Sequence, residues 1–588
     1  MITLENLQHL LRTWTAKKHD HTVIDDSLTL DNVPLWWFYE RLLEINFLPF
    51  ENNIEQLLEK INNQTLDPAF KKLQRKTKRI LFQKYLLHHQ NKSERNANKQ
   101  AQEGNKDIVF LSYLNQVREI SSQNALDSTK TNPTKTNLNL TKTNLSYFRL
   151  DSMIQECKKS SPYSCGVIVI DNLNAKDKKL LGKVNTLSPY ITSEIKTQAT
   201  KNAQQHHELW RKIPTSTKQQ LLTLQNQSLY PYLENYLEFF FSYEMLYLTH
   251  LYYLAFKAYL QQHSTKAVVT TAISSLYEKC LLAAASSVHI PSFMIQHGIA
   301  TGFTANDTSH LYGMHFCVMG PKYQKDLIAK GIAAQQIAVT GPLIFDEIVP
   351  YLTETIPHPE PKQHQPTQHH STQHHNNTSK INSTSTSKNI LFMTSPIVED
   401  NFLSKEDYFK KVKVILAQLL HVESTISLKL HPREQHADQY QRIIQELGLK
   451  NATVHTESTR ERHFVLIRNC CVFLNYGSTT ALEAMMLQKP IVTIDLFEDG
   501  KNPLNTFVRT SPATLKVHYN DHIDEIVQQA LDNPRILEKE RKQFVHDHCF
   551  LIDGKAPQRI LETIQHVIAP STEPKKTRTR NVSIIKER

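Results

Sequence analysis

The feature that most limits the fold is a series of apolar, β-branched segments with helical spacing between them. The first set comprises residues 107–114, 166–173, 267–274, 290–298, 316–320 and 337–341, and the second comprises 389–395, 426–431, 471–476 and 490–496. Apolar strands that alternate with helices are typical of parallel sheets with both faces covered. The sequence therefore predicts an α/β protein with two Rossmann-like, parallel-sheet domains.

Low-complexity segments suggest where these domains begin and end. We expect a mainly helical N-terminal extension at 1–104, Rossmann-like domains at 105–356 and 389–567, a linker at 357–388 and a basic disordered tail at 568–588. Segment 121–146 repeats TKTN three times and has too few apolar residues to join a core, so we predict a disordered insertion. The His-, Gln-, Ser- and Thr-rich tract at 357–388 can bind metals nonspecifically, but its composition favours a linker.

Composition narrows the class of protein further. The formal charge is +11, and part of the excess lies in Phe70–Leu87, where basic residues flank an apolar stripe. A basic helix can rest on the anionic inner membrane, and a solvated helix face explains the same pattern. No nucleic-acid-binding motif is present, so we predict no nucleic-acid partner. With no signal peptide and no run of about 18 apolar residues, we expect a cytoplasmic protein, with peripheral membrane contact at most.

Two further features have structural interpretations. The seven cysteines lack CxxC spacing, so we interpret them as reduced core thiols and predict no metal site. We also predict no cofactor, because the nucleotide-activated donor is a substrate. Residues 230–260 contain twelve aromatic side chains in a helical pattern. Core packing is the favoured use of these side chains, and an acceptor groove is the alternative.

The stretch FMIQHG places polar groups at the carboxyl end of a predicted strand, where open parallel sheets bind ligands. His297 is a candidate general base because its unperturbed pKa lies near neutrality, and Gln296 is its candidate partner. Gly298 permits a turn that a side chain would obstruct. Gly320 and Gly341 end the next two strand patterns, and we expect all three glycines to line a cleft.

The stretch ISLKLHPRE brings basic groups to a strand end of the second domain. Pro432 fixes its own φ and keeps the residue before it extended, so His431 is presented rather than folded into a helix. Lys429, His431 and Arg433 together suit a diphosphate. A solvated loop is the alternative.

The stretch CVFLNYGSTTALEAMMLQKPIVTIDL reads as strand, loop, helix and strand. Its helix begins among hydroxyl residues, and helix N-termini receive phosphate readily through unpaired N–H groups. We therefore predict that Gly477, Ser478, Thr479 and Thr480 bind the donor. Glu483 either completes a capping box with Thr480 or contacts a ribose hydroxyl.

Four motifs, the QHG turn, the KLHP loop, the GSTTALEAM helix start and LIDGKAPQRI at 551–560, occur in an order that resembles the GT-B transferases of bacterial surface polymers. That group includes capsular-polysaccharide Kdo transferases, CDP-glycerol glycerophosphotransferases and polysialyltransferases. The resemblance covers roughly 105–567. It implies a cleft between two domains, a nucleotide-sugar or CDP-polyol donor held mainly by the second, and a glycan or lipid-linked acceptor held mainly by the first.

The resemblance also implies residue roles. His297 is the catalytic or acceptor-side histidine, His431 and Pro432 are the donor-phosphate pair, and Ser478 and Thr479 are phosphate-binding hydroxyls. The sequence contains no Asp-x-Asp triplet, so we predict a metal-independent transferase that moves a sugar or polyol phosphate to a growing surface glycan. Two alternatives stay open: a nucleotide-sugar 2-epimerase, for which the sequence shows no convincing set of cleft carboxylates, and a non-catalytic scaffold of a glycan assembly complex.

Overall fold

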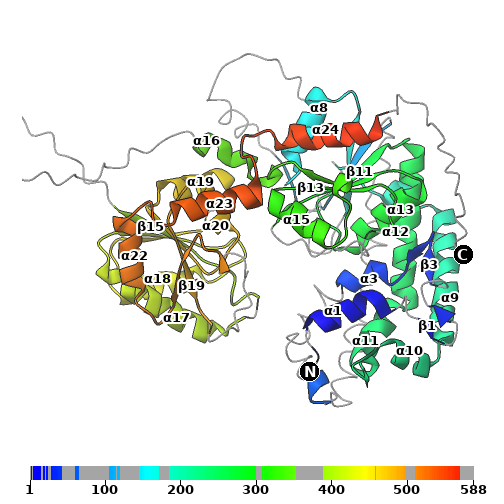
Figure 1. Cartoon of the computed structure of the whole chain (residues 1–588), viewed down its shortest axis with the longest axis horizontal. Helices are drawn as coiled ribbons and strands as arrows, with labels where there is room; N and C mark the ends of the chain where they lie inside the picture. Colours follow the sequence, from blue (N-terminus) through cyan, green and yellow to red (C-terminus); the bar gives the residue numbers. More distant parts are fainter. Residues whose placement is uncertain are drawn as a thin grey trace, which may run out of the picture.

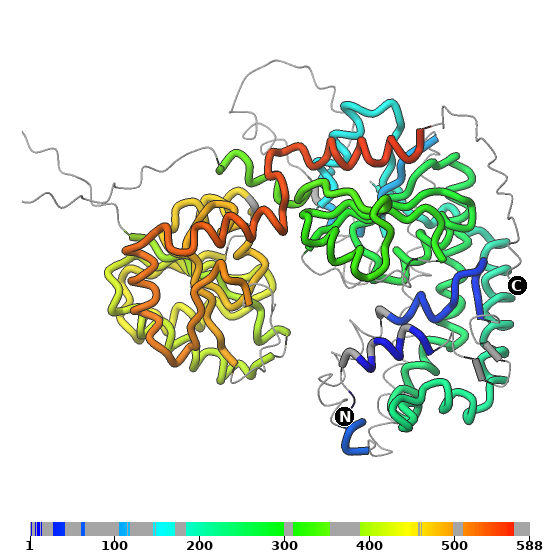
Figure 2. The backbone as a smooth tube through the Cα atoms, in the orientation of Figure 1, coloured from blue at the N-terminus to red at the C-terminus, as the bar shows by residue number. Residues whose placement is uncertain are grey.

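A computed structural model gives the architecture (Figures 1 and 2). It describes residues 2, 4–14, 18–19, 22–23, 28–42, 60–64, 105–113, 116–119, 145–147, 149–170, 184–298, 308, 310–352, 388–400, 402–456, 459–497 and 510–569. The basic helix expected at 70–87 lies outside these residues, as do 121–144, 353–387 and 570–588. Among the described helices, none is long and apolar enough to cross a membrane.

The first domain is built on a six-stranded parallel sheet with the order β14-β13-β12-β11-β5-β8. Its strands are β5 (Ile108–Tyr113), β8 (Cys165–Ile170), β11 (Ala267–Thr270), β12 (Ser292–Ile295), β13 (Met314–Val318) and β14 (Ile337–Val339). The chain adds β8 on one side of β5 and the later strands on the other. The carboxyl ends of β5 and β11 therefore form a topological switch point, where such sheets bind ligands.

The second domain has a six-stranded parallel sheet with the order β17-β16-β15-β18-β19-β20. Its strands are β15 (Asn389–Met393), β16 (Thr425–Lys429), β17 (Ala452–His455), β18 (Val472–Asn475), β19 (Ile491–Asp495) and β20 (Leu515–His518). Here the order reverses between β15 and β18. The predicted KLHP loop follows β16 and the GSTT loop follows β18, so both lie at the carboxyl edge of this sheet.

Helices cover both sheets. In the first domain these are α8 (Asp151–Ser160), α9 (Ser193–Lys212), α10 (Thr215–Leu221), α11 (Tyr230–Phe240), α12 (Tyr243–Gln262), α13 (Leu276–Ser287), α15 (Pro321–Ala329) and α16 (Val349–Leu352). In the second half they are α17 (Lys405–Gln418), α18 (Ala437–Glu446), α19 (Arg460–Asn469), α20 (Thr480–Met486), α22 (Ile523–Asp532), α23 (Glu538–Cys549) and α24 (Ala556–Ile568).

The N-terminal region packs onto the first domain. It contains α1 (Leu4–Thr13), a hairpin of β1 (Lys18–His19) and β2 (Thr22–Val23), a hairpin of β3 (Thr29–Leu30) and β4 (Val33–Pro34), and α3 (Trp37–Leu42). The hydroxyl of Tyr39 lies 2.7 Å from that of Thr249 on α12, and Lys279 on α13 forms a buried ion pair with Glu40. One continuous apolar core joins this region to α11, α12 and α13.

The aromatic stretch at 230–260 lies in that core. Phe240, Tyr253 and Phe256 are buried, and Phe241 stacks on Trp210 of α9 with ring centroids 4.2 Å apart. The interpretation of this stretch as core packing is therefore confirmed for these side chains.

The last described helix, α24, returns to the first domain. Figures 1 and 2 show α24 running from the second domain to lie beside α8. Its buried face, Ile560, Leu561 and Ile564, shares one apolar cluster with strands β5 and β8. The sequence places 389–567 in the second domain, whereas α24 within that range packs on the first.

The predicted fold class is confirmed: the chain is α/β and GT-B-like, with two Rossmann-like domains and a helical N-terminal region. The predicted insertion at 121–146 is too long at its end, because Leu145 and Ser146 belong to β7 (Leu145–Tyr147). That strand pairs antiparallel with β6 (Val117–Glu119). All seven cysteines are free, as predicted, but only five are in the core, because Cys165 is partly exposed and Cys471 is exposed.

Candidate active site

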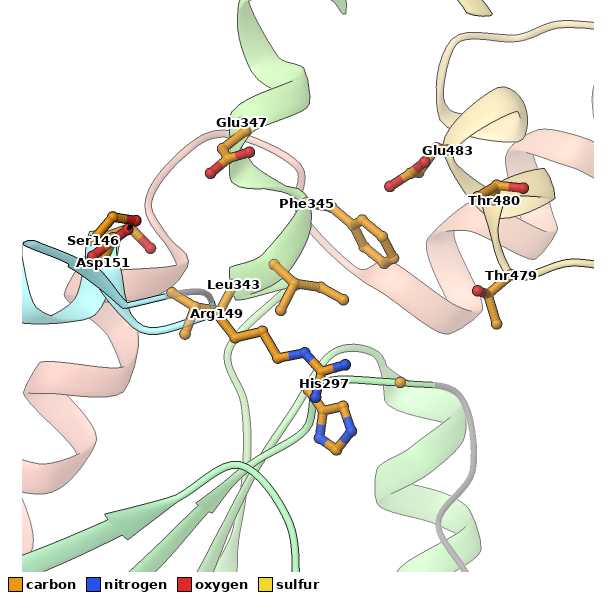
Figure 3. A pocket seen from close by; sticks show the side chains of 13 residues that line it. Ser146, Arg149, Asp151, His297, Leu343, Phe345, Glu347, Thr479, Thr480 and Glu483 are labelled. Carbon is orange, nitrogen blue, oxygen red and sulfur yellow. Dashed lines mark hydrogen bonds between the residues drawn. The ribbon is translucent and has the colours of Figure 1, made fainter. Parts of the chain in front are cut away.

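A cavity of about 340 Å³ lies where the two domains meet (Figure 3). The first domain contributes the turn before α8, the end of β12 and the 3₁₀ segment Leu343–Ile348, and the second contributes the start of α20. The cavity therefore joins the ligand-binding edges of both sheets. Its lining residues are Ser146, Arg149, Asp151, Ser152, His297, Gly298, Leu343, Ile344, Phe345, Glu347, Thr479, Thr480 and Glu483.

His297 stands at the carboxyl end of β12 and faces this cavity. Its Nδ1 is hydrogen-bonded to the carbonyl oxygen of Thr271, which accepts, so Nδ1 carries the proton. The lone pair of the neutral ring is then on Nε2. Burial and the nearby charge of Arg149 lower the pKa of His297, while the bond to Thr271 opposes the shift. The ring is therefore neutral at physiological pH and can accept a proton.

Gln296, the predicted partner of His297, is buried and engaged with the backbone. Its Nε2 donates to the carbonyl oxygen of Gly298 at 2.7 Å, and its Oε1 accepts from the N–H of Met319 at 2.9 Å. The side chain thus fixes the turn that carries His297, and it is absent from the cavity lining.

The three predicted cleft glycines have different surroundings. Gly298 lines the cavity, and an added Cβ there would meet nothing within 4 Å. A Cβ at Gly320 would lie 2.4 Å from the carbonyl oxygen of Asp547, and one at Gly341 would lie 2.8 Å from the guanidinium of Arg559. Gly320 and Gly341 therefore allow close packing against the returning C-terminal segment, and neither lines the cavity.

The GSTT loop is shaped by Asn475, which the sequence analysis did not single out. This buried side chain accepts from the N–H of Gly477 at 2.6 Å and from that of Ser478 at 3.2 Å. Gly477 has φ +104°, a conformation that favours glycine. Asn475 thereby turns the chain so that Thr479 and Thr480 reach the cavity.

The predicted capping box is wrong. Thr479 is the N-cap of α20 and makes no side-chain cap hydrogen bond, while the Ser478 hydroxyl accepts from the N–H and the hydroxyl of Thr480. The carboxylate of Glu483 instead contacts Nε2 of His463 on α19. Glu483 lines the cavity, and this contact joins it to α19 rather than to the start of its own helix.

The KLHPR loop lies at the same sheet edge but outside the cavity lining. Strands β16 and β18 are separated by β15, which puts the two loops about 10 Å apart across the edge. Arg433 forms a bidentate ion pair with Asp400 at 2.5 and 2.9 Å, and Lys429 donates to the carbonyl oxygen of Leu430 at 2.7 Å. Two of the predicted basic groups thus already have protein partners, one in the loop and one in the segment after β15.

His431 and its neighbour Pro432 complete that loop. The ring of His431 is half-buried, and its Nδ1 accepts from the N–H of Arg433 at 3.2 Å, while Pro432 is exposed. Burial and the charges of Arg433 and Lys429 lower the pKa of His431, against the opposing effect of two carboxylates. With Nδ1 accepting, the neutral ring carries its proton on Nε2, as a donor.

Glu434 organises the loop and was missed by the sequence analysis. Its carboxylate accepts from the N–H of His431 at 2.6 Å, from the hydroxyl of Tyr440 at 2.6 Å and from the hydroxyl of Thr394. Burial raises the pKa of Glu434 to about 7, although these hydrogen bonds oppose the shift. Only its position directly after the HPR motif could have drawn attention to it.

Arg149 and Asp151 are among the cavity residues that sequence reasoning missed. Asp151 holds the turn before α8, since its carboxylate accepts from the Ser146 hydroxyl and from the N–H of Tyr147 at 2.5 Å. Arg149 has φ +72°, which costs an L-residue about 1 kcal/mol. Both follow a low-complexity segment rather than an apolar strand pattern, and the sequence analysis looked for site residues at the ends of such strands.

Within the described part of the chain, no group of three or more His, Cys, Asp or Glu side chains is placed to hold a metal ion.

Comparison with known proteins gives a partial match. A family model described as UDP-N-acetylglucosamine 2-epimerase matches residues 306–565, which is less than half of the 588-residue chain. No curated protein matches the chain significantly in sequence.

One solved structure with similarity to the chain is the UDP-GlcNAc 2-epimerase from Neisseria meningitidis bound to UDP-GlcNAc. The two chains are 12% identical, and the TM-score is 0.43. The match covers 78% of this chain and 99% of the epimerase. Another is MurG from Acinetobacter baumannii, with 10% identity, a TM-score of 0.40 and coverage of 78% and 99%. The glycotransferase of kitacinnamycin has 10% identity, a TM-score of 0.38 and coverage of 79% and 100%.

Proposed function

We propose that this chain is a glycosyltransferase that moves a sugar, or a polyol phosphate, from a nucleotide-activated donor to a glycan acceptor. The observation that carries the proposal is the cavity itself, where a neutral histidine of the first domain faces the start of α20 in the second. A base on one wall and a hydroxyl-rich loop on the other are what an acceptor hydroxyl and a donor diphosphate need. The surface-polymer families that the motifs resemble provide the acceptor class.

His297 acts as the general base in this proposal. As the acceptor oxygen bonds to the anomeric carbon, or to the phosphorus of a polyol phosphate, its proton passes to Nε2 of His297. The bond from the reacting atom to the leaving phosphate oxygen breaks, and the nucleotide departs. Because Nδ1–H is held by Thr271, the ring keeps its orientation while it becomes charged.

The second domain binds the donor in this proposal. The Thr479 and Thr480 hydroxyls contact the phosphates, Glu483 accepts from a ribose hydroxyl, and Nε2–H of His431 donates to the nucleotide from the neighbouring loop. Hydrogen bonds aimed at the leaving group are stabilising where charge develops in the transition state. UDP-GlcNAc is the first donor to test, because the similar epimerase structure from Neisseria meningitidis contains it.

A nucleotide-sugar 2-epimerase is the second candidate, and two observations favour it. The family model that matches 306–565 is an epimerase model, and the cavity lining contains the carboxylates Asp151, Glu347 and Glu483. However, Asp151 fixes its own turn, so one of the three already holds a structural contact. Transfer therefore stays the leading proposal.

One experiment separates the two reactions. Donor preference is first found by thermal shift with CMP-, CDP-, UDP- and GDP-linked compounds, since a ligand at 100 times its Kd stabilises by about 2.7 kcal/mol. The preferred donor is then incubated in D₂O with and without glycan acceptors. We expect nucleotide release that depends on acceptor and persists in EDTA. Deuterium at C2 of the donor sugar without acceptor would instead establish epimerisation, and a chain that binds no donor would support the scaffold alternative.

The cellular location belongs to the same proposal. A transferase that uses nucleotide donors works where they are made, which places this chain in the cytoplasm, with Phe70–Leu87 as a candidate peripheral contact with the inner membrane. Vesicle binding that weakens with salt would support the contact.

A further inference from the structure

The motif LIDGKAPQRI, at 551–560, is the one of the four motifs to which the proposed function assigns no role. It joins α23 to α24, and none of its residues lines the cavity. The carboxylate of Asp553 accepts two hydrogen bonds of 3.0 Å from the guanidinium of Arg559 and one of 3.1 Å from the N–H of Lys555. The motif therefore fixes Arg559 across the first turn of α24.

Arg559 uses a further donor to contact the first domain. Its Nε–H donates to the carbonyl oxygen of Thr340 at 2.6 Å, and the N–H of Thr340 donates to the carbonyl oxygen of Val318 in β13 at 2.9 Å. Thr340 is buried and directly follows β14. The next residue, Gly341, has φ +90°, and a Cβ there would lie 2.9 Å from the carbonyl oxygen of Leu551. The chain thus leaves the sheet in close contact with the motif.

Asp346 provides a second contact between the same two parts of the chain. Its carboxylate oxygens are shielded from solvent near the start of α24. Burial raises the pKa of Asp346 to about 7, although the charge of Arg559 opposes the rise. The charge of Asp553 adds to the rise, and the N–H of Ala556 opposes it. Because a helix N-terminus attracts a carboxylate, the 3₁₀ segment Leu343–Ile348 is held against α24.

This 3₁₀ segment forms one wall of the cavity. Leu343, Ile344, Phe345 and Glu347 line the cavity, whereas Asp346 among them contacts the motif. Figure 3 shows the ring of Phe345 pointing from this segment toward the wall that α20 forms. A shift of the segment would therefore change the space between the proposed base and the hydroxyl residues of α20.

We propose that Arg559 is a positioning residue for the reaction, which holds this wall at its distance from α20 without touching the substrate. The inference rests on the proposed function and deepens it, because it connects the fourth motif to the site. A displacement of about 1 Å far from the chemistry can cost about 10²-fold in rate. The planar fork of arginine restrains a strand end and a helix start together, which suits this task better than the flexible ammonium of lysine.

The test compares two variants of Arg559 with two controls, all in the full chain. Arg559→Met keeps much of the apolar stem and removes every donor, and Arg559→Lys keeps the charge but not the fork. Ile564→Ala removes a buried contact of the same helix and leaves the donors of Arg559 intact. Arg442→Met removes an exposed ion pair with Asp438 on α18.

All measurements are made at a temperature at which thermal melting shows every variant to be folded. Hydrogen exchange, followed by mass spectrometry, reports local opening of the backbone at 341–348. Steady-state turnover and calorimetry use the CMP-, CDP-, UDP- or GDP-linked donor that the thermal-shift screen selects.

We expect Arg559→Met to speed exchange at 341–348 and to lower kcat, each by about tenfold or more. The Kd of the donor should stay within about threefold of the parent, because the proposed donor contacts lie in the second domain. Arg559→Lys should fall between Arg559→Met and the parent. Ile564→Ala should melt lower and keep kcat within about twofold, and Arg442→Met should match the parent throughout.

The inference fails if Arg559→Met leaves either kcat or exchange at 341–348 unchanged. It also fails if Ile564→Ala lowers kcat as much, because the arginine then acts only through helix packing. If Arg559→Met does not fold, Arg559→Lys is judged by the same criteria. These results leave the proposed function standing, since the parent still turns over its donor. A parent that turns over none of the donors overturns the proposed function, and exchange at 341–348 alone then decides whether Arg559 holds the wall.

Discussion

At the scale of single residues, the two histidines of the candidate site have opposite hydrogen-bonding roles at Nε2. His297 donates from Nδ1 to Thr271 and is left with an accepting Nε2, whereas His431 accepts at Nδ1 and is left with a donating Nε2. The sequence predicted both as functional residues, because each follows an apolar strand. It could not predict the tautomers, since these depend on a carbonyl oxygen far away in the chain in one case and on a turn in the other.

This difference predicts different kinetics for two alanine variants. His297→Ala should slow transfer by about 10²–10⁴ and leave nucleotide affinity within a few-fold, because a general base acts on the acceptor. His431→Ala should weaken nucleotide binding and turnover together, because a donor contact is lost in both states. Calorimetry and a transfer assay on the same preparations check this, with exposed His421→Ala as control. If His297→Ala lost nucleotide binding while His431→Ala kept it, the roles of base and donor contact would be reversed.

The pH dependence of the rate follows from the lowered pKa of His297. A lowered pKa keeps the ring neutral to more acidic pH, so kcat/KM should stay level through pH 6.5 and decline only below it. The decline at acidic pH is assigned to His297 if the residual kcat/KM of His297→Ala no longer shows it. A decline centred above pH 6.5 would contradict this assignment.

The effect of Glu434 should be measurable in the stability of the fold rather than in the rate of transfer. Its pKa is about 7 in the folded chain and about 4.5 when unfolded, so the folded state binds more protons between these values and loses stability as pH rises. Glu434→Gln should therefore gain stability relative to the parent between pH 4.5 and 8, on the order of 3 kcal/mol. Melting curves across this range, with exposed Glu423→Gln as control, measure the gain. A stability difference between Glu434→Gln and the parent that stays constant with pH would contradict this prediction.

At the scale of elements, periodicity located ten of the twelve strands in the two large sheets and missed β17 and β20. These are the two outermost strands of the second sheet, and their side chains are largely half-buried or exposed. Edge strands such as ATVH lack the continuous apolar run that marks a central strand. The capping box failed for a different reason, because a tertiary partner, His463, took the side chain that local sequence assigned to the helix terminus.

Helix α24 is the element whose role the sequence could not give. Its amphipathic pattern predicts a buried face, but not which domain it covers. We expect Ile564→Ala, at a fully buried position, to cost about 2–5 kcal/mol and to destabilise the first domain. Glu562→Ala on the exposed face of the same helix should change stability by less than about 0.5 kcal/mol. Hydrogen exchange that accelerates in the second domain and not in β5 and β8 would refute this assignment.

At the scale of the whole molecule, the sequence predicted two domains but not how their cores join. One apolar cluster runs from the N-terminal region through the first domain to Leu391 and Phe473 in the second. The contacts that create this continuity join residues far apart in the chain, and periodicity carries no information about them. The cavity is likewise formed by residues far apart in the chain, since Arg149, His297 and Thr479 come from three separate segments.

The return of α24 also determines when the first domain can be completed during synthesis. Leu352 ends the last helix of that domain before the linker, and Ile568 ends α24, so 216 residues (568 − 352) must still be translated. At about 5–20 residues per second this takes about 10–40 s. Throughout that interval α8 packs on this face of β5 and β8 without α24, so part of the apolar surface stays exposed and we expect the nascent chain to bind chaperones. A frameshift just before the codons for α24 would accordingly damage the domain that is made first.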